Sequence, residues 1–269
     1  MIASSANIQR PNGILTLLEF PRATHELAAL APSHLWLKSL PGGQGQPVIV
    51  IPGFSANNAT TMILRYYLRL WGYAAKPWPL GTNVNIMEIQ GFDDIAAFKD
   101  NAVTVMKQRL QQHFDRTGEK TTLIGWSLGG VFARVIAAEA QPYTQQVITL
   151  GSPFGDPRSV IVYPVLERIK KQSMSEQHLQ AWMAMCNAPL GNVGITNLYS
   201  RSDGFVPSAT ARNINHSLQQ AIHVHSSHVG FAINPLVLHL IAKLLHHNAK
   251  HWSPLAAHHA FERWLYALH

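Results

Sequence analysis

Apolar residues along this chain follow two periods: short continuous runs, and longer segments in which every third or fourth residue is apolar. The short runs are PVIVI from Pro47, YAAKPWP from Tyr73, TTLIG from Thr121, QVITLG from Gln146, ITNLYS from Ile195 and AIHVHS from Ala221. Short apolar runs that are bounded by turn residues fit strands buried on both faces. We therefore predict six strands in this order.

Segments with helical spacing precede and separate these runs. They cover His25 to Leu40, Asn57 to Trp71, about Asp93 to Arg116, and the residues that follow Ser127. Asn57 or Asn58 is a candidate cap for the second helix, and Gly72 and Gly118 end the second and third helices. This alternation predicts an α/β fold, with one domain over residues 1–269 whose mostly parallel sheet carries helices on both faces. In such sheets, sites lie at the carboxyl ends of the strands.

The stretch from about Asp156 to Val193 interrupts the alternation. Its two helix-like pieces, VYPVLERIKK and SEQHLQAWMAM, precede the strand ITNLYS, and we predict that they form a small helical cap over the sheet edge. The apolar residues of this cap either line an acyl groove or pack on the core. They are Val160, Ile161, Val162, Tyr163, Val165, Leu166, Trp182, Met183 and Met185.

The sequence GWSLG, from Gly125 to Gly129, joins the strand TTLIG to a helix. An abrupt turn from strand to helix brings the two elements close together, so glycine at both positions removes side chains that would collide. The turn presents the Ser127 hydroxyl above the sheet edge, near the positive end of the helix. We predict a nucleophile elbow with Ser127 as nucleophile. The alternative is a small residue at a tight turn.

A serine hydroxyl needs a base within hydrogen-bond reach and an acid that orients this base. Asp203 follows the strand ITNLYS, where a short turn projects its carboxylate, although Asp-Gly is also common turn chemistry. His228 lies in the loop after AIHVHS, and we expect His223 and His225 to lie within that strand. We therefore predict His228 as the base, with His225 as its competitor.

Four segments point to one family: VIVIPGF, LIGWSLGGVFAR, VITLGSPFGDP, and YSRSDGFVP with SHVGFAINP. With these segments, and with the order Ser, Asp, His, the sequence resembles bacterial α/β-hydrolases of the esterase and lipase group. It is also similar to the lipase-like domain of GPI inositol-deacylases. The resemblance spans most of Pro47 to Pro254 and implies Ser127, Asp203 and His228 as the catalytic triad.

The resemblance also implies an oxyanion hole formed by the backbone N–H groups of Phe54 and Leu128. Many lipases carry His-Gly where this chain has Pro52 and Gly53, so we expect different support for that loop. The implied reaction is hydrolysis of a small-molecule or lipid ester through an acyl-enzyme, without a cofactor. Two rival functions are acyl transfer to an alcohol, and lipid or partner binding by a catalytically silent fold.

Composition and charge limit the classes of binding partner that we expect for this chain. Hydrophobic residues make up 47% of the 269 positions and charged residues 13%, and the formal net charge is +7. The basic residues form no stripe with aromatics, so we expect no nucleic-acid partner, while weak contact with an anionic membrane surface stays open. The lack of a leader and of a long apolar segment favours a cytoplasmic location, and no oligomeric state follows from the sequence.

The C-terminal region holds two further patterns. His246, His247, His251, His258 and His259 crowd it, but no Cys or acidic cluster accompanies them, so we expect a solvated surface and no metal site. The tail AAHHAFERWLYALH places Phe261, Trp264, Leu265 and Leu268 on one helical face. We expect this face to pack on the domain, with contact to a membrane or partner as the alternative.

Overall fold

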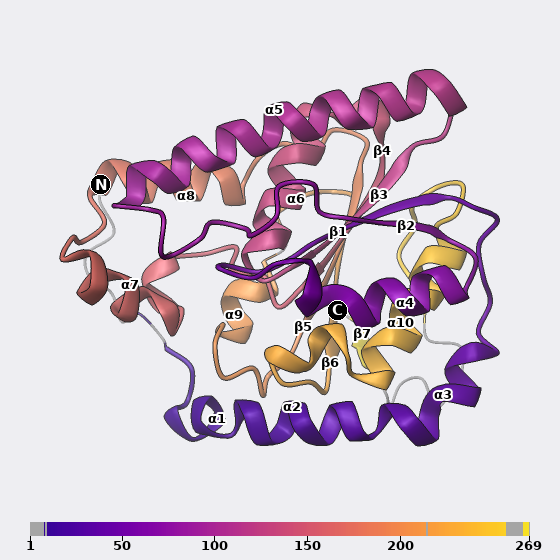
Figure 1. The fold of residues 1–269 in the computed structure, drawn as a ribbon, viewed down its shortest axis with the longest axis horizontal. Coiled ribbons are helices and arrows are strands. Elements are labelled where there is room, and N and C mark those ends of the chain that lie inside the picture. Colours follow the sequence, from indigo (N-terminus) through magenta and orange to yellow (C-terminus); the bar gives the residue numbers. More distant parts are fainter. Residues whose placement is uncertain (1–7, 9, 214, 257–265, 269) are drawn as a thin grey trace.

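The computed structural model describes residues 8, 10–213, 215–256 and 266–268. At its centre lies a seven-stranded sheet with the order β2-β1-β3-β4-β5-β6-β7 (Figure 1). The strands are β1 (Pro47–Ile51), β2 (Ala74–Pro77), β3 (Thr121–Trp126), β4 (Thr144–Leu150), β5 (Gly194–Tyr199), β6 (Gln219–Val224) and β7 (Tyr266–Leu268). The first six pair in parallel, whereas β7 runs antiparallel to β6. All six predicted strands are confirmed.

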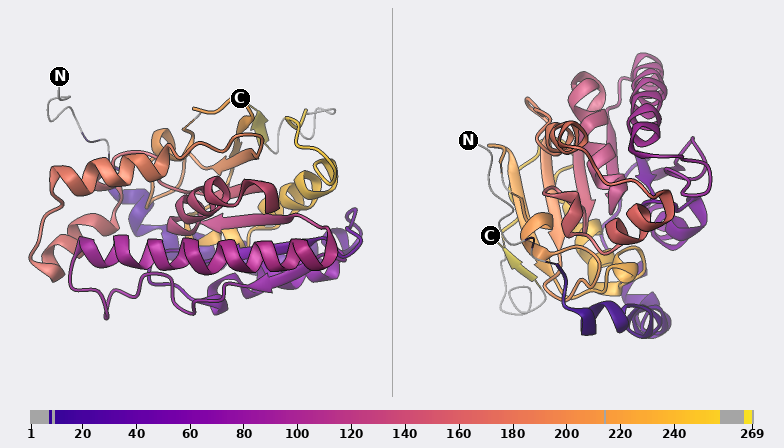
Figure 2. Two further views of the ribbon diagram at one scale, coloured as in Figure 1. Left: turned by 90° about the horizontal axis from the view of Figure 1, so that it is seen from above. Right: turned by 90° about the vertical axis from the view of Figure 1, so that its left-hand side faces the viewer.

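Helices cover both faces of this sheet (Figures 1 and 2). One face carries α5 (Phe92–Thr117) and α6 (Leu128–Glu139), and the other carries α3 (Leu30–Lys38), α4 (Met62–Leu70) and α10 (Pro235–His247). Successive residues of β1 enter different cores, because Ile49 and Ile51 pack with α5 and α6 while Val48 and Val50 pack with α4 and α10. Burial on both faces explains why these strands are continuously apolar in sequence.

Local signals set several helix ends where the sequence predicts them. Asn57 caps the 3-10 turn η1 (Asn58–Thr61) that leads into α4, because its side chain accepts a hydrogen bond from the Ala59 N–H at 2.9 Å. Helix α5 ends before Gly118, which has a φ of 72°. Glycine easily adopts this left-handed backbone conformation, which terminates the helix.

The N-terminal region differs from its prediction. The sequence predicts one helix from His25 to Leu40, but the chain forms α1 (Gly13–Leu17), α2 (Glu19–Ala28) and α3, divided at Leu18 and Ala29. The buried residues of α2 are Glu19 and Ala23, so a charged side chain faces inward, whereas the apolar side chains of Phe20 and Leu27 face outward. Asn12 starts α1 by accepting a hydrogen bond from the Ile14 N–H.

The segment between β4 and β5 contains η3 (Pro157–Ser159), α7 (Val162–Lys170) and α8 (Glu176–Cys186). Two side chains tie helix α8 to its surroundings: Trp182 Nε1 donates to the Gly155 carbonyl at 2.8 Å, and His178 Nε2 lies 2.9 Å from Asp93 Oδ1 at the start of α5. The short helices α9 (Ser208–Ala211) and η2 (Gln141–Tyr143) lie elsewhere in the connections.

The C-terminal tail requires a correction. Leu268 lies in strand β7 and pairs with Ile222 of β6, so it is not part of a helical face. Phe261, Trp264 and Leu265 lie outside the described residues, as do His258 and His259. This short strand pairs with backbone groups of β6 that would otherwise lie at the edge of the sheet. Backbone pairing of this kind cannot be predicted from the spacing of apolar side chains. No described helix is long and apolar enough to cross a bilayer.

Candidate active site

Ser127 lies at the junction of β3 and α6 with an unusual backbone conformation. Its φ is 55° and its ψ is −124°, which is rare for a residue with a side chain. The surrounding backbone fixes this conformation, because the Ser127 N–H donates to the Leu150 carbonyl at 2.9 Å and its own carbonyl accepts from Gly130 at 3.0 Å. Strain of this kind persists where neighbouring structure enforces it, and it concentrates at functional sites.

The two glycines of the GWSLG segment permit close approach of backbone to backbone. A Cβ on Gly125 would collide with the backbone of Gly129 and Gly130, and a Cβ on Gly129 would collide with the carbonyls of Ile51 and Pro52. The close backbone contacts that the sequence predicts at these glycines are therefore present. Because of them, the serine turn packs directly against the end of β1.

Asp203 and His228 meet across two loops. Asp203 lies in the loop after β5, and His228 precedes the 3-10 helix η4 (Val229–Ala232) after β6. The Nδ1 atom of His228 and Oδ2 of Asp203 are 2.8 Å apart, and the two side chains are only 4% and 1% exposed. The other oxygen of Asp203 accepts the N–H groups of Phe205 and Val206, each at 2.8 Å. The carboxylate therefore has a fixed direction and favours a proton on Nδ1 of the imidazole.

The competing base, His225, is placed differently. Strand β6 ends at Val224, so His225 lies just beyond it and not within it as expected. The exposed His225 stacks edge to face on His223, with ring centroids 4.9 Å apart. Among the described residues, the Asp203 carboxylate pairs with the imidazole of His228 and not with that of His225.

Two aromatic residues that the sequence reasoning missed hold the His228 ring. The ring centroids of Phe205 and Trp126 lie 5.2 and 5.9 Å from that of the imidazole. Trp126 also donates from Nε1 to the His228 carbonyl at 3.0 Å. Trp126 directly precedes Ser127, and Phe205 follows Asp203 by two residues. This closeness to predicted site residues was the signal in the sequence from which their role could have been predicted.

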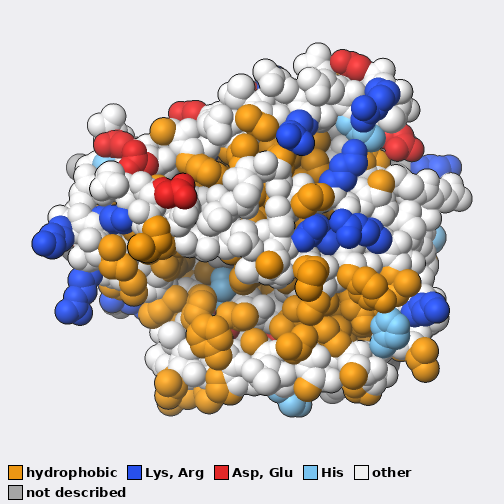
Figure 3. Space-filling view, viewed as in Figure 1, with side chains coloured by type: hydrophobic (Ala, Val, Ile, Leu, Met, Phe, Trp, Pro, Cys, Tyr) orange, Lys and Arg blue, Asp and Glu red, His pale blue; other side chains and the backbone are white. Residues whose placement is uncertain are grey.

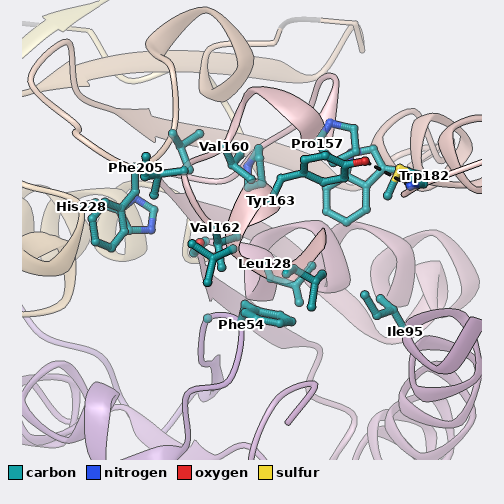
Figure 4. A pocket seen from close by; sticks show the side chains of 18 of the residues that line it. Phe54, Ile95, Leu128, Pro157, Val160, Val162, Tyr163, Trp182, Phe205 and His228 are labelled. Carbon is teal, nitrogen blue, oxygen red and sulfur yellow. Dashed lines mark hydrogen bonds between the residues drawn. The ribbon is translucent and has the colours of Figure 1, made fainter. Parts of the chain in front are cut away.

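Ser127 and His228 line one cavity of about 590 Å³. Figure 4 shows His228 and Phe205 toward one end of this cavity, and Trp182 and Ile95 toward the other. Most of its lining is apolar, and eight of the nine cap residues named from the sequence contribute to it. The ninth, Met183, packs against the core. The lining also includes residues that were not predicted, from α5 and the N-terminal helices: Phe92, Ile95, Ala96, Lys99, Thr16 and Phe20.

Exposed apolar side chains lie on the helices that contribute to the cavity, α1, α2 and α7. Figure 3 shows hydrophobic side chains gathered around a hollow on the face that carries α1 and α7. The exposed fractions are 78% for Leu17, 68% for Phe20, 51% for Val165 and 56% for Ile169. Phe20 and Val165 also line the cavity itself. The apolar lining therefore continues to the surface, which suits the entry of an apolar ligand.

No family model and no curated protein matches the sequence. Solved structures do resemble the fold. TT1662 from Thermus thermophilus gives a TM-score of 0.58 at 14% identity, covering 78% of this chain and 92% of that one. A structure from work on LipS and LipT, two metagenome-derived lipolytic enzymes, gives 0.54 at 15%, covering 79% and 96%. A soluble variant of monoglyceride lipase from Saccharomyces cerevisiae, in complex with a substrate analog, gives 0.53 at 11%, covering 78% and 89%.

The chain has the α/β-hydrolase fold. In this α/β-hydrolase fold, the loop after β1 and the turn before α6 both reach the cavity, where they contribute Phe54 and Leu128. The backbone N–H groups of these two residues make no hydrogen bond within the described part of the chain. Phe54 and Leu128 line the same cavity as Ser127, so their N–H groups are candidate donors to an oxyanion there.

Asn83 supports the β1 loop of this hydrolase fold. Its buried side chain donates from Nδ2 to the Pro52 carbonyl at 2.7 Å, and its backbone bonds to Ser55 and Ala56 at 2.7 and 2.8 Å. Ser55 takes a φ of 53°, so the loop is held in a conformation that a free chain rarely adopts. In this chain the loop after Pro52 and Gly53 is supported by this asparagine, which lies too far along the chain to be predicted.

Other reactive side chains lie away from the cavity. Cys186 is buried, and this burial raises the pKa of its thiol to about 12, which keeps it protonated at neutral pH. His247 lies 2.8 Å from the Ser253 hydroxyl. In residues 8, 10–213, 215–256 and 266–268, no group of three or more His, Cys, Asp or Glu side chains is arranged to hold a metal ion.

Proposed function

We propose that this protein is a serine carboxylic-ester hydrolase in which Ser127 is the nucleophile, His228 the base and Asp203 the orienting acid. One observation carries the proposal: a serine in a strained turn and an imidazole paired with a buried carboxylate line the same apolar cavity. The similar structures named as lipolytic enzymes and as a monoglyceride lipase add support. The narrower resemblance to GPI inositol-deacylases stays a prediction.

The proposed reaction proceeds in two half-reactions. Nε2 of His228 accepts the Ser127 proton while the serine oxygen attacks the ester carbonyl carbon, and the carbonyl oxygen becomes an oxyanion. The N–H groups of Phe54 and Leu128 stabilise this oxyanion, at about 3 kcal/mol for each donor. The intermediate collapses as His228 protonates the leaving alcohol. Water, deprotonated by the same imidazole, then cleaves the acyl-enzyme and restores the serine.

The cavity supports a preference for esters with an extended apolar acyl chain. A chain that leaves the reacting carbonyl near Ser127 can lie between α5 and α7, against Ile95, Val162 and Tyr163. Each methylene that moves from water into this lining contributes about 0.8 kcal/mol. The segment with α7 and α8 thus acts as a cap that supplies substrate contacts.

A fluorophosphonate probe and a panel of nitrophenyl esters test the proposal. The wild-type chain should react once with the probe, and Ser127→Ala should abolish labelling and lower kcat about 10⁶-fold. Asp203→Asn should lower kcat about 10⁴-fold, because the imidazole then adopts the wrong tautomer. Circular dichroism spectra of both variants should match that of the wild type.

Three outcomes would contradict parts of this proposal. A wild-type chain that the probe does not label would indicate a silent hydrolase fold. Faster hydrolysis of acetyl than of decanoyl or palmitoyl esters would refute the preference for long chains. Transfer of the acyl group to an added alcohol, at the expense of free acid, would identify an acyltransferase.

A further inference from the structure

The N-terminal helices α1 and α2 contact the two loops that carry Asp203 and His228. In Figure 1, α2 runs along the lower edge of the molecule, on the side where β5 and β6 lie. It packs against η4, the 3-10 helix that His228 precedes. The hydroxyl of Thr16 in α1 donates to the Gly204 carbonyl at 2.6 Å. A segment near the start of the chain is thus part of the surroundings of the acid and the base.

One carboxylate in this segment joins both loops. Glu19 is fully buried, and its Oε1 accepts the Gly204 N–H at 2.7 Å while its Oε2 accepts the Val229 N–H at 3.2 Å. Gly204 directly follows Asp203, and Val229 directly follows His228. We propose that Glu19 is a positioning residue that sets the separation and direction of the Asp203–His228 pair. This inference rests on the proposed hydrolase function.

Neighbouring residues of α2 strengthen the same contact. Arg22 forms an ion pair with Glu19 at 3.7 Å and donates from Nη2 to the Ser202 hydroxyl at 2.9 Å. Glu26 accepts the Ser227 N–H and the Ser227 hydroxyl, each at 2.7 Å. Residues on both sides of the acid and the base are therefore held by one helix.

Glycines in the two loops make room for these helices. A Cβ on Gly204 would lie 2.5 Å from the Leu15 carbonyl carbon, and a Cβ on Gly230 would collide with the Glu26 carboxylate. Neither glycine has a positive φ, so conformational freedom is not what these positions require. Both glycines serve the docking of α1 and α2.

The chemistry at Glu19 requires a carboxylate. Both of its loop partners are backbone N–H donors, and burial of an anion is costly unless such donors and a cation compensate it. Glutamine keeps the shape but turns one acceptor oxygen into a donor, so its amide group faces a backbone N–H. Glu26 differs, because the Ser227 hydroxyl that donates to it can rotate and accept from a glutamine amide.

Glu19 does not line the cavity, so it contributes no substrate contact. Its loss should change the geometry of proton transfer and leave ground-state binding of the ester largely intact. The expected signature is therefore a lower kcat at nearly constant KM. Misplacement of a reacting group by about 1 Å can cost about 100-fold in rate.

The experiment compares Glu19→Gln, Glu26→Gln and Leu37→Ala, each in the 269-residue chain, with the wild type. Leu37 is fully buried in α3, which packs mainly on α10, α2 and α4, and it makes no hydrogen bond to either loop from its side chain, so Leu37→Ala destabilises the N-terminal region without removing a loop hydrogen bond. Each protein is assayed well below its unfolding midpoint, for nitrophenyl ester hydrolysis and for the second-order rate of fluorophosphonate labelling. Glu19→Gln should lower kcat and the labelling rate about 30-fold, with KM within about twofold.

The two controls separate positioning from stability. Glu26→Gln should lower kcat about threefold or less, and Leu37→Ala should lower the unfolding midpoint while kcat stays within about twofold. If Glu19→Gln labels and turns over at the wild-type rate, or if Leu37→Ala loses as much activity as Glu19→Gln, the positioning role is wrong. If the wild type itself is neither labelled nor active, the proposed function fails, and the positioning role fails with it.

Discussion

The serine turn and the acid–base pair are built in different ways. The turn is local: its residues follow one another from Gly125 to Gly130, and close backbone packing fixes it. The acid–base pair is assembled from two loops, and Glu19 reaches them from 185 and 210 residues away in sequence. The nucleophile therefore depends on steric exclusion within a short segment, whereas its partners depend on long-range hydrogen bonds.

This difference predicts different responses to substitution. Backbone atoms cannot move aside independently, so a clash at the serine turn distorts everything that it joins. Hydrogen bonds to the acid and base loops can be lost one at a time, and each loss costs only part of the geometry. A single substitution at the turn should therefore cause a large loss of stability and kcat, whereas single substitutions at the loops should each cause a smaller, partial loss.

Among substitutions outside the proposed triad, Gly129→Ala should have the largest effect. Its new Cβ collides with the carbonyls of Ile51 and Pro52, so β1 and α6 must separate. We expect a loss of about 3 kcal/mol in the free energy of unfolding and about 100-fold in kcat. Urea titration and ester hydrolysis measure the two quantities. Wild-type values for both would show that the turn is not fixed by steric exclusion.

Gly204→Ala should have an intermediate effect, because it separates α1 from the Asp203 loop. The new Cβ lies 2.5 Å from backbone atoms of Leu15, and we expect a loss of about 10-fold in kcat and about 2 kcal/mol in stability. Gly13→Ala is the matched control, since nothing lies within 4 Å of its Cβ. Equal losses from the two variants, by steady-state kinetics and thermal unfolding, would argue against the close contact.

Asn83→Ala should have a smaller effect than Gly204→Ala. It removes the hydrogen bond to the Pro52 carbonyl but retains the backbone bonds of the β1 loop, so we expect kcat to fall about fivefold. Asn85→Ala is the control, because among the described residues that side chain bonds only to its neighbours Glu88 and Met87. Steady-state kinetics on one nitrophenyl ester distinguishes the variants. Wild-type activity of Asn83→Ala would show that the asparagine side chain is not needed to support the loop.

Cys186 should give the smallest effect, with kcat at pH 7 unchanged in Cys186→Ala. Burial raises the pKa of its thiol from 9.0 to about 12, so the unfolded chain loses this proton at a lower pH than the folded chain. The thiol's contribution to stability is therefore complete below pH 9 and is lost as the pH rises toward 12. Urea titrations at pH 7 and 10 should show a larger loss for the wild type than for Cys186→Ala. Rapid modification of the native thiol at pH 7 would contradict its burial.

The strands could be predicted from sequence because their burial on both faces leaves continuous apolar runs, as in Pro47–Ile51. The helix from Asp93 to Arg116 was predicted within one residue at each end, because Gly118 marks its end. The N-terminal helices were missed in part, since α2 buries a glutamate and exposes Phe20 and Leu27. An inward charge and an outward apolar face reverse the pattern on which sequence reasoning depends.

Local chemistry alone determined the strands of the sheet and the glycine-flanked turn at Ser127, because periodicity and close packing leave their mark within a few neighbouring residues. The sequence favoured His228 over His225, and the tertiary structure decided between them by pairing His228 with Asp203. Tertiary structure alone decided that Asn83 supports the β1 loop and that Glu19 spans both loops. The physical reason is that a hydrogen bond between distant residues requires only a donor and an acceptor. Polar residues are common along the chain, and only the folded backbone selects which of them meet.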